Sequence, residues 1–198
     1  MTTIAVVDHG AGNLVSIAQG LERVGARVVV ATDPSGLTGA DALVLPGVGT
    51  TRGVMDGIDA GGFRSSIEQW DRPLLGICVG MQVLFASSDE DDAQCFGFLS
   101  GTVELLEDAP RLPHIGWNDV TIGDDPLFAG LEADPTFYFV HSYAPTPGRP
   151  ANVIGTASYG QRFTAAVRSG QRMGTQFHPE RSGENGLQLL ANFVAMIP

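Results

Sequence analysis

The sequence predicts an α/β fold with a mostly parallel central sheet flanked by helices, and with additional antiparallel strands in its C-terminal half. In the N-terminal half, short apolar runs alternate with helical stretches, which is typical of parallel strands joined by crossover helices. In the C-terminal half, strand-like segments follow one another with only turns between them, and this arrangement favours antiparallel pairing.

Apolar runs in the N-terminal half predict four buried strands, at residues 4–7, 28–31, 42–45 and 74–77. The spacing i, i+3, i+4 and i+7 predicts a helix after the first strand, on the apolar side chains of Leu14, Ile17, Ala18 and Leu21. Residues 52–70 also predict helix, interrupted by Gly57, Gly61 and Gly62. Another helix is expected to start within residues 80–86.

The C-terminal half contains further strand-like segments, at residues 103–106, 119–122, 137–140, 153–157, 163–167 and 173–177. Loops are expected at residues 145–150 and in the acidic run 89–92. A last helix starts near Glu184 and should bury one face, formed by Leu187, Leu190, Ala191 and Val194. Because no repeat or clear linker interrupts the pattern, residues 1–198 are expected to form one domain.

Charge and composition exclude several classes of protein. The chain has 11 cationic and 22 acidic side chains, and all of its cations are arginine. Without lysine there is no Schiff-base chemistry and no Walker A phosphate loop. The net charge of −11 argues against nucleic acid or an anionic membrane as a partner. Since no signal peptide or membrane span is visible, we expect a cytoplasmic protein with two free thiols.

The sharpest local motif surrounds Cys78, in the sequence Gly-Ile-Cys-Val-Gly of residues 76–80. It follows a predicted strand and opens a predicted helix, as the G-x-nucleophile-x-G turn of hydrolases does. The helix N-terminus beside the thiol favours the thiolate. We therefore interpret Cys78 as a nucleophile, whereas Cys95 has no such setting.

A cysteine nucleophile needs a base, and His178 has the best context for one. It follows the predicted strand 173–177, and Pro179 restricts the residue before it to extended geometry. Residues i and i+2 of an extended segment point to the same side, so Glu180 is expected to orient the His178 ring. The expected catalytic set is therefore Cys78, His178 and Glu180.

Acyl transfer also needs an oxyanion hole. The Pro-Gly-Val-Gly turn of residues 46–49 can aim backbone N–H groups at an oxyanion, and Val79 would add its own N–H. A dinucleotide site at residues 8–13 is disfavoured because Val15 replaces the third glycine of that fingerprint. The histidines have no metal-ligand spacing, so we expect neither a metal nor a cofactor.

Together these motifs resemble the class I (triad) glutamine amidotransferases, which have a flavodoxin-like fold. Finer blocks resemble one of their families, the glutaminase subunits of imidazole glycerol phosphate synthase; these blocks are residues 8–14, 46–49, 113–118, 137–143 and 176–183. The resemblance extends from residue 4 to about residue 196. It implies that Cys78 attacks glutamine, that His178 passes a proton to the leaving ammonia, and that Glu180 holds His178.

The same resemblance assigns binding roles. It implies an oxyanion hole from Gly47, Val48, Gly49 and Val79, and glutamine-holding positions at Gly49, Gln82, Ser142 and Tyr143. The partner it implies is a (βα)8-barrel cyclase subunit. That subunit would use the ammonia to make imidazole glycerol phosphate and aminoimidazole carboxamide ribonucleotide in histidine biosynthesis. Interface positions would be Asn13, Trp117, Tyr138 and Arg181.

The chain departs from this family at a few positions. His9 stands where tyrosine is usual, and Arg181 replaces a frequent lysine. Thr50 and Thr51 follow the oxyanion turn, where the family usually has a small residue and phenylalanine. Three alternatives stay open: the glutaminase subunit of another triad amidotransferase, such as pyridoxal-phosphate synthase; a free-standing γ-glutamyl cysteine hydrolase; and a non-catalytic subunit. The Pro-Gly-Val-Gly-Thr turn speaks against the first, and the intact catalytic set against the last.

Overall fold

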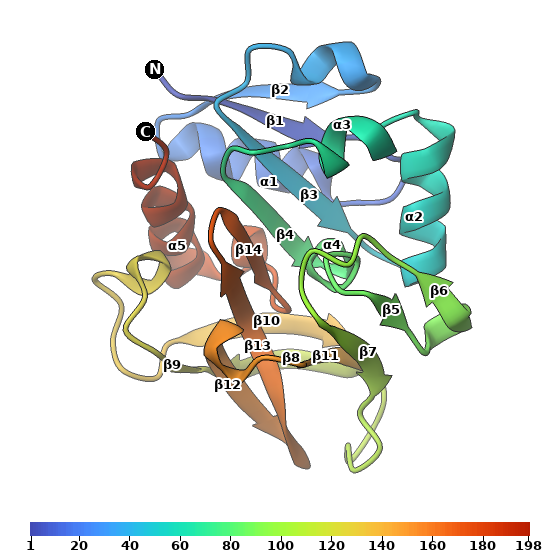
Figure 1. Cartoon of the computed structure of the whole chain (residues 1–198). Helices are drawn as coiled ribbons and strands as arrows, with labels where there is room; N and C mark the ends of the chain where they lie inside the picture. The colour runs from blue at the N-terminus through green and yellow to red at the C-terminus, as the bar shows by residue number, and fades with distance from the viewer.

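An eight-stranded mixed sheet runs through the molecule, and the computed structural model describes all residues, 1–198 (Figure 1). In spatial order its strands are β2 (Arg27–Ala31), β1 (Thr3–Val7), β3 (Ala42–Gly47), β4 (Leu74–Cys78), β14 (Arg172–Thr175), β13 (Gln161–Ser169), β12 (Val153–Tyr159) and β9 (Thr121–Ile122). The strands from β2 to β14 are parallel, and those from β14 to β9 are antiparallel. The predicted fold class is thus confirmed.

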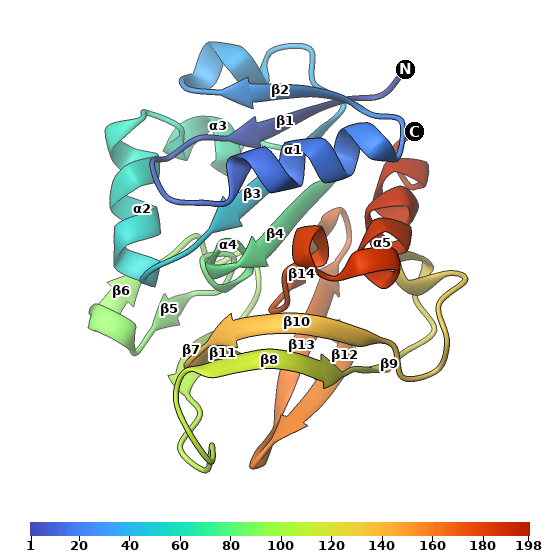
Figure 2. The same cartoon turned by 180° about the vertical axis from the view of Figure 1, so that it is seen from behind.

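Helices cover both faces of the parallel half. They are α1 (Leu14–Arg23), α2 (Thr51–Ala60), α3 (Arg64–Glu68), α4 (Val79–Gln82) and α5 (Gly183–Ala195). Helices α1 and α5 lie together on the face seen in Figure 2, while α2 and α3 lie on the opposite side, as right-handed crossovers require. Strands β3 and β4 are therefore buried along their whole length, which explains their unbroken apolar sequences.

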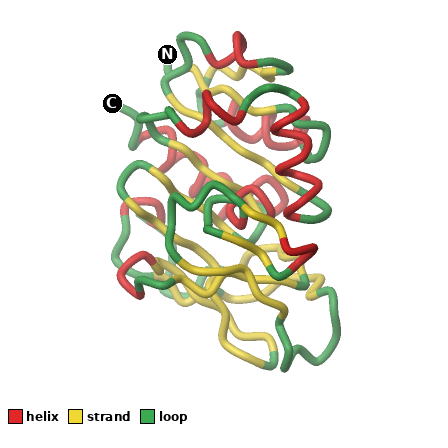
Figure 3. Tube along the Cα trace, turned by 45° about the vertical axis from the view of Figure 1, so that its right-hand side comes forward, coloured by secondary structure: helices red, strands yellow, loops and turns green.

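Two smaller sheets lie in the part of the molecule where strands dominate (Figure 3). One is a two-stranded ribbon of β8 (His114–Asp119) and β10 (Thr136–His141). The other joins β11 (Tyr143–Pro147), β7 (Gly101–Leu105), β5 (Ser87–Ser88) and β6 (Ala93–Gln94), in that order. Short 3-10 helices lie in the connections: η1 (Pro34–Leu37), η2 (Glu90–Asp92), η3 (Pro126–Phe128), η4 (Pro150–Asn152) and η5 (Pro179–Arg181).

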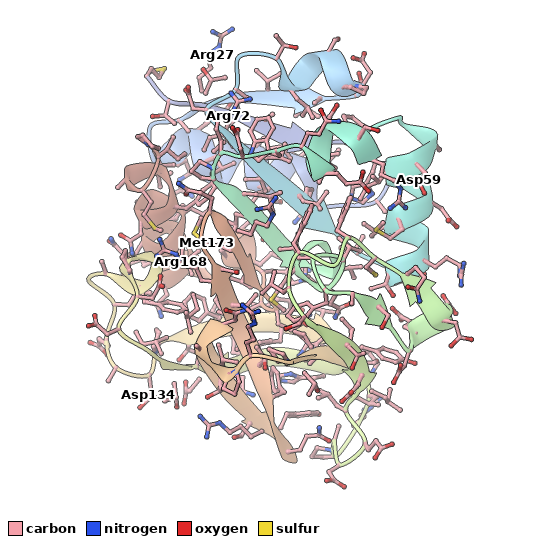
Figure 4. All side chains as sticks on the ribbon, viewed as in Figure 1. Arg27, Asp59, Arg72, Asp134, Arg168 and Met173 are labelled. Carbon is pink, nitrogen blue, oxygen red and sulfur yellow. The ribbon has the colours of Figure 1, made fainter.

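The ion pair between Arg168 and Asp125 joins a loop to the sheet. Arg168 lies on β13 opposite Met173 of β14 (Figure 4), and its guanidinium is 3.2 Å from the Asp125 carboxylate. Asp125 also caps η3 by accepting a hydrogen bond from the Leu127 N–H. No helix of the protein has the length and apolar character needed to cross a bilayer.

The structure corrects four expectations. Residues 114–119 form strand β8, although only 119–122 were expected to be extended. Residues 145–147, expected in a loop, belong to β11, because this strand lies at a sheet edge, where proline is tolerated. Helix α4 ends at Gln82, and the chain then tightens into i−3 hydrogen bonds. The buried face of α5 is centred on Gly186, Leu189, Leu190 and Phe193.

Substitution of Gly80 tests the close packing of α4 against β3. A Cβ atom at residue 80 would overlap the Leu45 carbonyl oxygen, so Gly80→Ala should destabilise the protein by about 1–3 kcal/mol. Urea unfolding followed by circular dichroism measures the change. In the matched control, Gly53→Ala, the new Cβ lies 3.4 Å from Thr50 Oγ1 inside α2, and we expect unchanged or slightly higher stability. Equal unfolding energies for the two variants would contradict this packing.

Candidate active site

Cys78 occupies a strained turn at the end of β4. Its backbone has φ 55° and ψ −114°, an unusual conformation for a residue with a side chain, and α4 begins at the next residue. Gly76 and Gly80 permit this turn, because a Cβ atom on Gly76 would overlap the Gly80 carbonyl oxygen. Such strain persists only where the surrounding structure holds it, and it is often found at active sites. The turn therefore has the geometry that the sequence motif predicts.

The parallel register brings three segments together around Cys78. Gly47 at the end of β3 lies opposite Cys78, and Thr175 of β14 lies opposite Ile77. The chain that follows β3 is the Gly47–Gly49 turn, and the chain that follows β14 leads to His178. Because parallel strands end at the same sheet edge, Cys78, the Gly47–Gly49 turn and the His178 segment meet there.

His178 and Glu180 form a buried pair. The ring Nδ1 lies 2.9 Å from Glu180 Oε1, with 6% and 2% of the two side chains exposed. The backbone N–H of His178 donates to the Tyr138 carbonyl oxygen at 2.9 Å, which anchors this segment to the ribbon. Pro179 starts the 3-10 turn η5, so Glu180 reaches His178 through a turn rather than through the extended segment expected.

The environment of His178 favours its charged form. Burial lowers the pKa of the ring, but hydrogen bonds to Cys78 and Glu180 outweigh this cost and raise the pKa to about 10. Since Nδ1 faces Glu180, Nε2 is the ring nitrogen that remains for Cys78. At neutral pH both ring nitrogens of His178 therefore carry a proton. An imidazolium beside a thiol is the arrangement that stabilises a thiolate nucleophile.

A pocket of about 270 Å³ opens beside the Cys78 thiol. It brings together most of the residues expected at the site: Val48, Gly49, Cys78, Val79, Gln82, Ser142, Tyr143, His178 and Arg181. Gly47 and Glu180 do not line it, since Gly47 lies below the turn, where a Cβ atom would come within 2.6 Å of the Gly80 nitrogen, and Glu180 lies behind the histidine. Gly49 has φ 89°, a left-handed conformation that favours glycine.

Gln82 supports the pocket wall. Its Nε2 donates to the Tyr143 carbonyl oxygen at 2.9 Å and to Gln176 Oε1 at 3.0 Å. Both amide hydrogens are thus used inside the protein, and only the Gln82 Oε1 remains for a ligand.

Five residues that line the pocket or contact the thiol were not predicted as site residues from the sequence: Glu90, Pro113, Val140, His141 and Gln176. Glu90 comes from the acidic run that was expected to be fully solvated, and burial raises its pKa, opposed by a hydrogen bond from the Thr51 N–H. The Gln176 amide lies 3.6 Å from Cys78 Sγ, and the thiol points to the Val140 carbonyl at 3.7 Å. Gln176 precedes His178 by two residues, and this spacing was a usable signal.

Three of the four expected interface residues form one cluster on the ribbon. Trp117 and Tyr138 are paired across β8 and β10, with ring centroids 5.9 Å apart and planes at 72°. The Arg181 guanidinium lies over the Tyr138 ring at 4.4 Å. Trp117 is 58% exposed, and Ile115 on the same strand face is 60% exposed. Asn13 lies outside this cluster, as the residue before α1.

The departures from the family pattern have structural roles. The Nε2–H of His9 donates to the Pro46 carbonyl oxygen at 2.6 Å, so His9 holds the peptide that enters the Gly47–Gly49 turn. Thr50 caps α2 by accepting a hydrogen bond from the Gly53 N–H at 3.1 Å.

Cys95 lies away from the pocket, and burial raises the pKa of its thiol to about 11. Its setting is therefore that of an unreactive cysteine.

Comparison with known proteins identifies the family to which the chain belongs. Residues 5–197 match the family model Glutamine amidotransferase class-I, and the chain belongs to this family. The solved structure of a protein from Thermoplasma acidophilum, described as part of a putative GMP synthase, has a TM-score of 0.74 and 25% identity, over 98% of this chain and 93% of that one.

Curated relatives place the chain more narrowly. It is 47% identical to the imidazole glycerol phosphate synthase subunit HisH of Pseudomonas putida, over 98% of both chains. It is 44% identical to the protein of the same name from a Synechococcus strain, over 98% of this chain and 94% of that protein. Within the class, the chain is thus a member of the HisH family.

The Glu180 carboxylate should control the charge of His178. Glu180→Gln removes a negative charge and weakens a hydrogen bond to the protonated ring, so the pKa of His178 should fall from about 10 toward the ordinary histidine range. An NMR titration of the ring carbon signals measures this change. Glu184→Gln is the matched control, because it removes a charge from the first turn of α5 without touching His178. If both variants titrate like the unmodified protein, Glu180 does not stabilise the imidazolium.

Proposed function

We propose that this chain, as one glutamine amidotransferase domain over residues 1–198, hydrolyses L-glutamine to glutamate and ammonia through Cys78, His178 and Glu180. The observation that carries the proposal is the buried Glu180–His178 pair, whose second ring nitrogen faces a strained cysteine at the pocket. In this proposal Cys78 is the nucleophile, His178 carries the proton and Glu180 orients the His178 ring.

In the proposed reaction, the Cys78 thiolate attacks the γ-amide carbon of glutamine. The tetrahedral oxyanion is stabilised by the Val79 N–H and by N–H groups of the Gly47–Gly49 turn, which line or adjoin the pocket. The His178 imidazolium donates its Nε2 proton to the amine, which leaves as ammonia. Water then attacks the thioester with His178 as base and releases glutamate.

The pocket is suited to the amino-acid end of glutamine. The Glu90 carboxylate lies on the pocket wall, where it can pair with the substrate's α-ammonium group. The Ser142–Tyr143 backbone forms another part of the wall, and Gln82 fixes its orientation through the Tyr143 carbonyl. A substrate that lacks the α-ammonium group would leave the half-buried Glu90 carboxylate beside the pocket without a cationic partner.

We further propose that the ammonia passes to a (βα)8-barrel cyclase subunit in the cytoplasm, in a heterodimer that makes imidazole glycerol phosphate and aminoimidazole carboxamide ribonucleotide. The relatives named above are subunits of imidazole glycerol phosphate synthase. The exposed cluster of Trp117, Tyr138 and Arg181 supports such docking, because aromatic residues and arginine are enriched at interfaces. Strand β10 links this cluster to the pocket, since Val140 lines the pocket two residues beyond Tyr138.

Replacement of the nucleophile tests the reaction. Cys78→Ser should lower glutamine-dependent ammonia release by roughly 10³-fold or more, because the serine hydroxyl is not ionised by His178. The complex with the cyclase should keep its activity with ammonium salts, since the two reactions use separate chains. Cys95→Ser is the matched control, and we expect full activity from it. Retained glutamine activity in Cys78→Ser would overturn the assignment of the nucleophile.

Partner dependence tests the proposed assembly. Ammonia release from glutamine should be low for the chain alone and strong with the cyclase and its nucleotide ligand. Trp117→Ala should weaken the complex at least about tenfold in a binding titration, because a large exposed aromatic contact is lost. Val30→Ala, an exposed apolar position on β2, should bind normally. Full activity of the isolated chain would instead indicate a free-standing glutaminase or γ-glutamyl hydrolase.

A further inference from the structure

Two histidines that take no part in the catalytic set lie beneath the β8–β10 ribbon. His114 and His141 face each other across the two strands, and their side chains join through Nδ1 of His114 and Nε2 of His141 at 3.1 Å. They are only 3% and 6% exposed. His141 also lines the pocket beside the thiol, whereas His114 does not.

Aromatic packing fixes the orientation of this pair. The His114 ring stacks between Tyr159, at a centroid distance of 4.0 Å, and Phe139, at 5.1 Å. The His141 ring lies 4.9 Å from the Phe163 ring. Burial lowers the pKa of both histidines, and for His141 it reaches about 3, so both rings are neutral at physiological pH.

Neutral rings and fixed partners determine which nitrogen holds each proton. The Nδ1 of His141 lies 2.9 Å from the Tyr143 carbonyl oxygen, which only accepts, so this nitrogen carries the proton. Its Nε2 is then an acceptor, and His114 must donate from Nδ1. The remaining His114 nitrogen, Nε2, faces the amide of Asn118 at 3.5 Å and accepts from it. One directed chain of hydrogen bonds therefore runs from Asn118 to Tyr143.

The end of this chain is the pocket wall. The Tyr143 carbonyl accepts from two sides, from Gln82 Nε2 and from His141 Nδ1, each at 2.9 Å. The preceding carbonyl, that of Ser142, accepts from the Leu106 N–H at 3.0 Å. Both carbonyls of the Ser142–Tyr143 segment are thus held by the protein, so the orientation of its peptide groups toward the pocket depends on these bonds.

We propose that His141 is a positioning residue for glutamine binding, which holds the Tyr143 carbonyl through Nδ1 and is itself held by His114 and Asn118 of the ribbon strand β8. This inference rests on the proposed function, because the Ser142–Tyr143 wall matters only if glutamine binds there. Asn118 adjoins Trp117 in β8, so the same chain of bonds joins the exposed cluster to the substrate pocket.

Two amide variants of His141 separate its two bonds. The amide nitrogen of asparagine takes roughly the place of Nδ1 and donates as it does, whereas the amide oxygen of glutamine takes the place of Nε2 and accepts from His114. His141→Asn should therefore keep the bond to Tyr143 and bind glutamine with a KM within about threefold of the unmodified chain. His141→Gln should raise KM about tenfold, the effect of one buried hydrogen bond, with a smaller change in kcat. The assay uses the complex with the cyclase.

His114, which donates to His141, is tested with one variant and one control. His114→Phe keeps the aromatic stack but removes the donor to His141, and should raise KM in the same direction by a smaller factor. Tyr159→Phe keeps the same stack and removes a hydroxyl outside this chain of bonds, so KM should not change. A deficient His141→Asn with a normal His141→Gln, or equal KM values for both, would overturn the proposal.

The proton positions can be tested without any assay of activity. Long-range nitrogen–proton NMR spectra of the isolated chain distinguish the two neutral histidine tautomers. We expect the Nδ1–H tautomer for both His114 and His141. An Nε2–H tautomer at His141 would overturn the proposal even if the chain is an active glutaminase. Absence of glutaminase activity in the unmodified complex, with the expected tautomers present, would instead refute the proposed function.

Discussion

The site depends on the strained backbone of Cys78, whose positive φ turns the chain from β4 into α4. That turn is possible only because glycines flank the cysteine, and it is held by β3 and β14 on either side of β4. The same two strands lead into the Gly47–Gly49 turn and into the His178 segment. A single parallel register thus both maintains the strain and assembles the groups that surround the thiol.

The charge of neighbouring groups determines the protonation of the histidines at the site. A histidine buried as deeply as His178 would ordinarily lose its proton, yet Glu180 and Cys78 raise its pKa to about 10. His141, in the same pocket but without an acidic partner, stays neutral. The site therefore contains one histidine with a raised pKa and one with a lowered pKa. Both are buried, so the difference arises from the charge of their partners.

Local patterns were sufficient to predict much of this protein. Short apolar runs and motifs of a few residues predicted the strands of the parallel half and the position of Glu180 beside His178. Strand β8 was missed because its only apolar side chains, Ile115 and Trp117, face solvent, and its partner β10 lies some 20 residues further along the chain. Glu90 and His141 enter the site only through tertiary contacts, with Thr51 and with His114, which no local pattern encodes.

The prolines of β11 affect the tendency of the protein to self-associate. This strand is at the edge of its sheet and begins at Tyr143, in the pocket wall. Unpaired strand edges invite pairing with a second chain, and Pro145 and Pro147 remove two of the N–H donors that such pairing would need. The two prolines thus disfavour edge-to-edge pairing of β11 with a second chain. They are also the reason that this strand is not predicted from the sequence.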